Sequence, residues 1–136
     1  MAQTMDELLD HVETAVMGDA EALREVVDED VLLLGTDPGE ELEGGQAAVA
    51  AMARQVETVG RATFEREHDR RVREPGDVAW FAEHGRMRFG ERGLRVRLTG
   101  VAVRRDGGWK VAQLQAAPCE EPAALRPVAA PDAARA

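Results

Sequence analysis

Residues 94–117 read LRVRLTGVAVRRDGGWKVAQLQAA, two alternating segments joined by an Asp-Gly-Gly turn at 106–108. Asp-Gly pairs favour tight reversals between antiparallel strands, so we expect a hairpin with strands near 94–105 and 109–117. Both faces of this hairpin carry apolar side chains, which are Leu94, Val96 and Leu98 on one face and Val101 and Val103 on the other. Because neither face is wholly polar, we expect helices to cover one face and a partner chain to cover the other.

The region before the hairpin predicts three helices and one short strand. Residues 4–7, TMDE, have the spacing of a capping box and open a helix over about 5–17. Asp19 is expected to cap a second, short helix. Residues 31–34, VLLL, form a short apolar strand, and residues 35–45, GTDPGEELEGG, are rich in turn formers and predict a loop. An apolar stripe at helical spacing after that loop predicts the third helix.

Two further strands are expected before the hairpin, near 61–73 and 77–89, because Pro-Gly and Gly-rich turn signals bound them. The predicted order is therefore ααβαββββ, an α+β fold. Strands of this length twist and coil, so we expect a curved antiparallel sheet packed on the three N-terminal helices. Residues 1–117 are expected to form a single domain, and the Ala- and Pro-rich residues 118–136 a flexible tail.

Charge is distributed unevenly along the 136 residues, which carry a net charge of -9. Residues 1–60 contain 15 acidic residues and two arginines, whereas residues 61–105 contain 12 arginines and seven acidic residues. The acidic total argues against nucleic acid and against an anionic membrane surface as partners. The basic sheet either forms surface ion pairs with the acidic helices or turns some arginines toward an anionic ligand.

The cysteine content and the N-terminal sequence limit which compartment and which cofactors are expected. Cys119 is the only cysteine, so an intramolecular disulfide and a cluster of thiolate metal ligands are both excluded. The N-terminus is acidic where a secretory signal is basic, and no apolar run is long enough for a membrane span, so we expect a cytoplasmic protein. The three histidines lack metal-binding spacing and the glycines lie in turns, so no metal or cofactor is expected.

Two local patterns resemble the nuclear transport factor 2-like superfamily, which includes the SnoaL-like polyketide cyclases and the ketosteroid isomerases. They are the strand-loop-helix stretch VLLLGTDPGEELEGGQAAV at 31–49 and the hairpin RLTGVAVRRDGGWKVAQLQ at 97–115. The resemblance covers about 3–117. It implies a cone-shaped fold, a deep apolar pocket between the sheet and the helices, and frequent homodimerisation through the outer sheet face.

The resemblance also suggests candidates for a general base. In ketosteroid isomerases an Asp beside a Pro after the first strand is the base, and Asp37 precedes Pro38 at the similar place here. The chain has no tyrosine, and the position that resembles the second Asp of those enzymes is apolar, so that constellation is incomplete. His84 and His68 are alternative bases, since an imidazole titrates near neutral pH. Each candidate also has a structural reading: Asp37 as a turn cap, and the histidines as exposed or structural residues.

Ligand contacts are expected on the strands. By alternation Trp109, Gln113 and Gln115 share one face of the last strand, and the resemblance suggests that this face meets the pocket. Buried glutamines need hydrogen-bond partners, which a ligand would supply; the alternative is that they face solvent at the rim of a dimer. Arg97 and Trp80 are the further ligand-binding candidates, with an outer ion pair as the alternative role for Arg97.

We therefore expect a homodimeric domain that binds a small, partly apolar organic ligand, anionic if the sheet arginines face it. One alternative is a cofactor-independent isomerase, cyclase or dehydratase that acts next to a carbonyl with Asp37 or His84 as base. Another is an interaction module whose basic sheet face binds an acidic protein.

Overall fold

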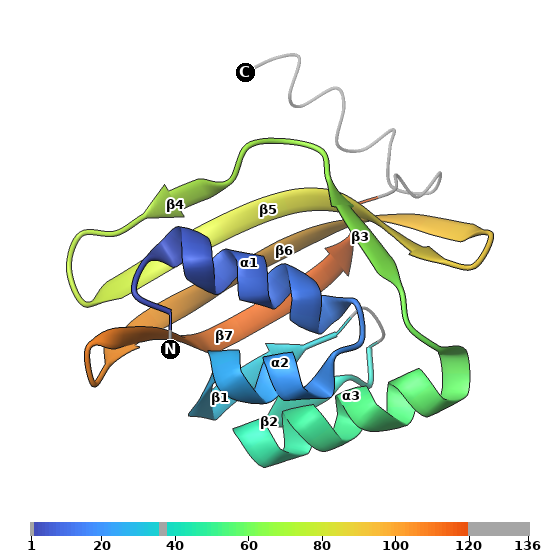
Figure 1. Cartoon of the computed structure of the whole chain (residues 1–136), viewed down its shortest axis with the longest axis horizontal. Coiled ribbons are helices and arrows are strands. Elements are labelled where there is room, and N and C mark those ends of the chain that lie inside the picture. The colour runs from blue at the N-terminus through green and yellow to red at the C-terminus, as the bar shows by residue number, and fades with distance from the viewer. Residues whose placement is uncertain (1, 36–37, 120–136) are drawn as a thin grey trace.

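The computed structural model describes residues 2–35 and 38–119 as three helices and seven strands (Figure 1). The helices are α1 (Met5–Val16), α2 (Ala20–Val26) and α3 (Gly45–Val59). The strands are β1 (Val27–Leu34), β2 (Glu41–Glu43), β3 (Thr63–Arg66), β4 (Arg71–Arg73), β5 (Val78–Phe89), β6 (Arg92–Arg105) and β7 (Gly108–Pro118). The predicted α+β class and the predicted order of helices and long strands are confirmed.

The helix starts follow the capping chemistry that the sequence predicts. The Thr4 hydroxyl accepts a hydrogen bond from the Glu7 N–H at 3.1 Å, and Asp19 accepts one from the Ala22 N–H at 3.0 Å. Each cap satisfies an N–H group that has no partner inside the helix, which stabilises a helix end by about 1 kcal/mol. Five residues of α1, Met5, Leu8, Leu9, Val12 and Ala15, are buried on one side, so this helix packs flat against the sheet.

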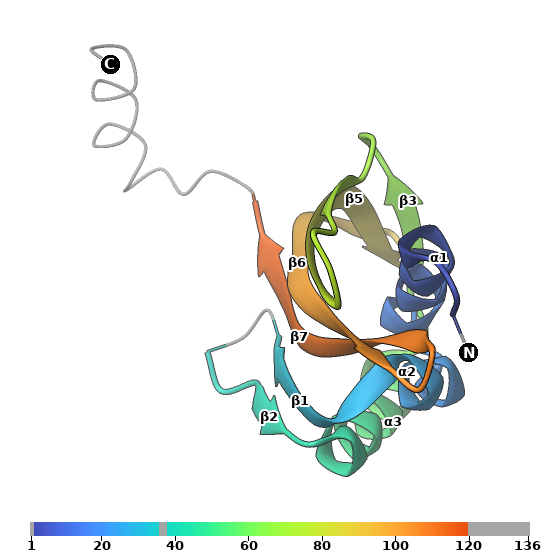
Figure 2. The ribbon, with the colours of Figure 1, turned by 90° about the vertical axis from the view of Figure 1, so that its left-hand side faces the viewer.

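The sheet has the strand order β2-β1-β7-β6-β5-β3, and β4 pairs with β5 beyond the end of β3. All neighbours are antiparallel except β1 and β7, which run parallel, so the last strand lies beside the first. The three helices lie together on the concave side of the curved sheet, and no described element covers its outer face (Figure 2). In the part of the chain that the structure describes, no helix is long and apolar enough to cross a membrane.

Three strand boundaries differ from the sequence prediction. The strand expected at 61–73 is broken into β3 and β4, which are separated by residues 67–70, EHDR. The loop expected at 35–45 contains β2, which pairs with β1 through Leu33 and Leu42. The first strand begins at Val27 rather than at Val31, since buried Val27 pairs with Val111 of β7.

The main core lies between the helices and the inner sheet face. Leu8, Leu9 and Val12 of α1 meet Leu98 and Trp109 of the sheet, and all five are at most 1% exposed. Burying each of these side chains stabilises the fold by roughly 1.5–3 kcal/mol. A second, smaller core of Ala62, Met87 and Val96 lies farther along the sheet, with Phe64, Phe89 and Leu94 packed against it.

The predicted boundary between domain and tail falls inside the last strand. Pro118 still pairs with Val96, and the Cys119 N–H donates to the Arg95 carbonyl at 3.0 Å. Residues 120–136, which hold most of the predicted tail, lie outside the described residues.

Candidate functional site

The outer sheet face brings together five residues that the sequence singled out, Trp80, His84, Arg97, Gln113 and Gln115. The β5–β6 register sets Trp80 opposite Val101 and His84 opposite Arg97, while the β6–β7 register sets Gln113 beside Val101 and Gln115 beside Thr99. Directly paired residues share a face, so all five side chains are on the side away from the helices. A ligand that contacts these residues, as the sequence predicts, therefore binds on the outer face rather than in the concave interior.

Trp109 does not share that face, and the expectation that it lies with Gln113 and Gln115 is wrong. Its side chain is 1% exposed in the main core, where the Arg104 guanidinium lies 4.4 Å from the ring centroid. The strand β7 contains a β-bulge at Ala112. Gln113 pairs with Val101 and Val111 pairs with the next residue, Ala102, so Ala112 has no partner on β6. One extra residue exchanges the two faces of a strand. The inward residues are therefore Trp109 and Val111 before the bulge and Leu114 after it.

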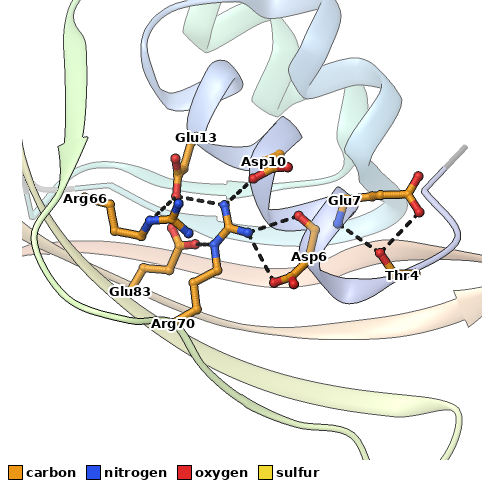
Figure 3. A network of polar contacts seen from close by, with 8 residues as sticks. All are labelled: Thr4, Asp6, Glu7, Asp10, Glu13, Arg66, Arg70 and Glu83. Atoms are coloured by element: carbon orange, nitrogen blue, oxygen red, sulfur yellow. Dashed lines mark hydrogen bonds and ion pairs between the residues drawn. The ribbon is translucent and has the colours of Figure 1, made fainter.

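On the concave side, the Arg70 guanidinium joins four carboxylates from two separate elements, α1 and β5 (Figure 3). Its Nη2 donates to Asp10 at 2.6 Å and to Glu13 at 3.0 Å, both on α1, and its Nη1 lies 3.3 Å from Asp6. Its Nε donates to Glu83 of β5. The Arg70 side chain is 8% exposed, so these contacts lie largely out of water. We call Asp6, Asp10, Glu13, Arg70 and Glu83 the arginine–carboxylate cluster.

Glu83 is the buried end of this cluster, with an exposed fraction of 1%. Burial, together with the negative charge of Glu13, raises the pKa of Glu83 to about 7, although Arg70 acts in the opposite direction. The second carboxylate oxygen of Glu83, Oε2, has no hydrogen-bond partner in the described part of the chain. Glu83 therefore binds a proton near neutral pH, which is the property required of a general acid or base.

Burial alone would lower the pKa of Arg70, but its hydrogen bonds to Asp10 and Glu13 and the charge of Glu83 outweigh burial and raise it. Arg70 is thus a permanent cation inside the cluster.

Glu83 is not among the residues that the sequence predicts for a site, although the pattern of β5 contains a signal for it. The inward positions of β5 are otherwise apolar or small, namely Ala79, Phe81, Gly85 and Met87. An acidic residue inside such a row needs a buried cation, and Arg70 supplies it.

A separate pocket of about 280 Å³ opens between the C-terminal end of α3 and the turn that joins β5 to β6. Its apolar wall is formed by Val59, Phe89 and Leu94, and its polar side by Arg92 and the backbone at Gly93. Phe89 and Leu94 also pack against the second core, which holds this apolar wall in place. No carboxylate among residues 2–35 and 38–119 forms an ion pair with Arg92. We call this site the mouth pocket.

The remaining candidates are not brought into either inner site. Asp37 lies outside the described residues, so its expected role as a base stays a prediction. His68 is exposed beside His84, with ring centroids 5.4 Å apart. Within the described residues no three side chains of His, Cys, Asp or Glu are arranged to hold a metal ion.

Comparison with protein families shows to which family the chain is related. The family model described as the SnoaL-like domain matches residues 2–119. The chain belongs to the SnoaL-like domain family. A comparison of this SnoaL-like domain with curated proteins gives no match.

Solved structures confirm the nuclear transport factor 2-like fold of this SnoaL-like domain. An NTF2-like protein of unknown function from Pseudomonas putida KT2440 is 18% identical, with a TM-score of 0.76, over 88% of this chain and 87% of that one. An uncharacterized protein with a cystatin-like fold from Caulobacter vibrioides is 20% identical, with a TM-score of 0.74, over 91% and 94%. A candidate scytalone dehydratase from Novosphingobium aromaticivorans DSM 12444 is 14% identical, with a TM-score of 0.70, over 85% and 82%. These TM-scores establish a shared fold, which by itself says nothing about a reaction.

Proposed function

We propose that this SnoaL-like domain binds a small organic molecule with an apolar body and an anionic group in the mouth pocket. The observation that carries the proposal is the combination of three apolar side chains, Val59, Phe89 and Leu94, with the unpaired cation of Arg92 in one concavity. Small-molecule sites are mostly apolar and contain few polar groups that fix orientation. The volume of about 280 Å³ is close to the lower end of the range for such sites, which favours a compact ligand.

Binding alone, rather than catalysis, is what this pocket supports. Phe89 and Glu83 lie on the same strand six residues apart, or about 20 Å at the rise of an extended strand. A ligand in the mouth pocket therefore lies too far from the proton of Glu83 to exchange it.

The test is a thermal-shift screen of aromatic and branched aliphatic carboxylates, each paired with its uncharged amide. We expect some carboxylates to raise the melting temperature and their amides to do so less, because only the carboxylate pairs with Arg92. Arg92→Gln should reduce the affinity for the best carboxylate roughly tenfold, as the loss of a charge-assisted hydrogen bond does.

A blocking variant locates the site. Val59→Trp fills the pocket and should abolish the shift, whereas Ala53→Trp, an exposed position on the same helix, is the matched control and should retain it. Binding that survives in Val59→Trp, or a panel with no active compound, would contradict the proposal.

The enzymatic alternative is a cofactor-independent isomerase, cyclase or dehydratase with Asp37 or His84 as general base. It has its own measurement: the loss of the α-proton signal of a carbonyl ligand in D₂O, followed by NMR. Exchange that is lost in Asp37→Asn or in His84→Asn, with the folded spectrum intact, would favour this alternative. The candidate scytalone dehydratase of the same fold supports testing it.

We further propose that two copies associate through the apolar half of the outer sheet face. Val78 and Trp80 are 45% and 50% exposed there, and Val101 and Val103 pair with them across β5 and β6. Large exposed apolar side chains that adjoin one another are typical of subunit contacts.

A further inference from the structure

The other half of the outer face carries a concentration of positive groups around His84. The β5–β6 register sets His84 opposite Arg97. Arg71 of β4 pairs with Ala82, one position along the same face of β5. His68, just before β4, places its ring edge-on against the ring of His84 with centroids 5.4 Å apart. We call His68, Arg71, His84 and Arg97 the basic cluster.

Within the described residues, the two arginines of the basic cluster are not neutralised by ion pairs. Neither Arg71 nor Arg97 forms an ion pair with any carboxylate in the described ranges, whereas the neighbouring Arg95 lies 3.3 Å from Glu67. The pKa of His84 is lowered by its burial and then by His68, Arg97 and Arg71, and only Glu67 acts in the opposite direction. Arg71 and Arg97 are both positively charged and both lie close enough to His84 to lower its pKa, so a bound anion would offset the repulsion between them.

The donors of the cluster define the chemistry of that anion. Arginine presents a planar fork of N–H groups that matches the oxygens of a carboxylate or phosphate, and two imidazoles add further donors. Two neighbouring imidazoles could also suit a metal ion, but Arg71 and Arg97 repel a cation. Thr99 and Gln115 occupy the next row of the same face and offer neutral polar groups.

We propose that His68, Arg71, His84 and Arg97 form a binding site for a small oxyanion, a carboxylate or a phosphate, on the outer face of the sheet. This site is separate from the mouth pocket, which lies at the C-terminal end of β5, beyond His84, and on the concave side. It stands whether or not the mouth pocket binds a ligand.

The experiment is an NMR titration of the imidazole signals with inorganic phosphate in one arm and acetate in the other. Sodium chloride at equal ionic strength serves as the control for screening. The chain has only three histidines, so each signal can be assigned, and exposed His11 on α1 is an internal reference. We expect saturable shifts of His84 and His68 and no saturable shift of His11. The arm with the tighter binding identifies the class of oxyanion.

Variants distinguish the cluster from general surface charge. Arg97→Gln and Arg71→Gln should each weaken oxyanion binding roughly tenfold or more, as the loss of a charge-assisted hydrogen bond does. Arg88→Gln, an exposed arginine farther along β5, is the matched control and should change affinity less than twofold.

Three results would overturn the proposal. The first is equal movement of the His11 and His84 signals, and the second is equal loss of affinity in Arg88→Gln and Arg97→Gln. The third is movement of the His84 signal with protein concentration and not with either anion, which would assign the cluster to a contact between subunits. Ligand binding that survives in Val59→Trp would contradict the mouth pocket and leave the oxyanion titration unaffected, so the two proposals fail independently.

Discussion

Glu83 is a buried acidic residue that requires a buried cation beside it. Its carboxyl group is buried on the inner face of β5 and meets Arg70 on one oxygen only. A buried ion pair adds little net stability, because the cost of removing two charges from water offsets their attraction. Removal of either residue, however, leaves the buried charge of the other without an opposite charge.

This burial predicts a pH dependence of stability. The pKa of Glu83 is raised to about 7 from an ordinary value of 4.5, so the folded state holds the proton more tightly than the unfolded chain. The resulting stabilisation is complete below about pH 4.5 and is lost as the pH rises through about 7. Relative to Glu83→Gln, the wild-type free energy of unfolding should fall by on the order of 2 kcal/mol between pH 5 and pH 8.

Urea unfolding followed by circular dichroism at several pH values measures this difference. Glu65→Gln, at an exposed position on β3, is the control and should leave the wild-type pH dependence unchanged. Parallel curves for wild type and Glu83→Gln would show that Glu83 does not hold a proton near neutral pH.

Among the elements, the connection between β3 and β4 depends most on side-chain chemistry. The sequence predicted one strand at 61–73, but residues 67–70 separate β3 from β4, and Arg70 turns inward to α1 and β5. Alternation alone could not reveal this break, because the four residues are all polar and the reason for it, Glu83, lies on another strand. Asp69 also disfavours a strand at this point.

Removal of Arg70 should therefore loosen the connection and destabilise the fold. At pH 8, where Glu83 is ionised, Arg70→Met should reduce the free energy of unfolding by about 3 kcal/mol, because a buried carboxylate loses its cation. Arg70→Met combined with Glu83→Leu should recover most of the loss, since no charge then stays buried. Arg66→Met is the control, because Arg66 touches the cluster only through Glu13 at 3.7 Å and is more exposed.

Chemical denaturation gives the free energies, and hydrogen exchange of residues 67–70 reports on the connection itself. A double variant that is no more stable than Arg70→Met alone would show that Arg70 acts through packing rather than through the charge of Glu83.

The bulge in β7 marks the limit of reading elements from sequence. Both strands of the final hairpin were predicted, since their alternation and their Asp-Gly turn are local signals. The exchange of faces after Val111 was not, because an extra residue in one strand is visible only when the register with its partner is known. This one residue moves Gln113 and Gln115 from the predicted pocket to the outer face.

The whole molecule presents two unlike surfaces, a concave side covered by helices and an open outer face (Figure 2). Fold class and element order were predictable, because helical stripes, turn residues and long alternating segments are each encoded locally. The arginine–carboxylate cluster was not, since its members lie on α1, β5 and the β3–β4 connection and meet only in the folded chain.

The proposed association of two copies is tested at this scale. Trp80→Asp places a charge in the centre of the apolar half of the outer face and should convert a dimer to a monomer in sedimentation velocity experiments. Val59→Asp is the matched control, because Val59 is similarly exposed, at 54%, but lies on α3. A wild-type chain that sediments as a monomer at all concentrations, or a Trp80→Asp variant that stays dimeric, would contradict the proposed interface.

The central place of β7 also affects when the sheet can form during synthesis. Since β7 is the strand that joins β1 to β6, the N-terminal strands and the later meander share no hydrogen-bonded neighbour until it is present. On a translating ribosome, β1 and β2 therefore wait for residues 108–118, almost the last of the domain, to leave the exit tunnel. Shortened chains that end before Gly108 should stay unfolded and sensitive to protease, and completion of the sheet should coincide with release of the finished domain.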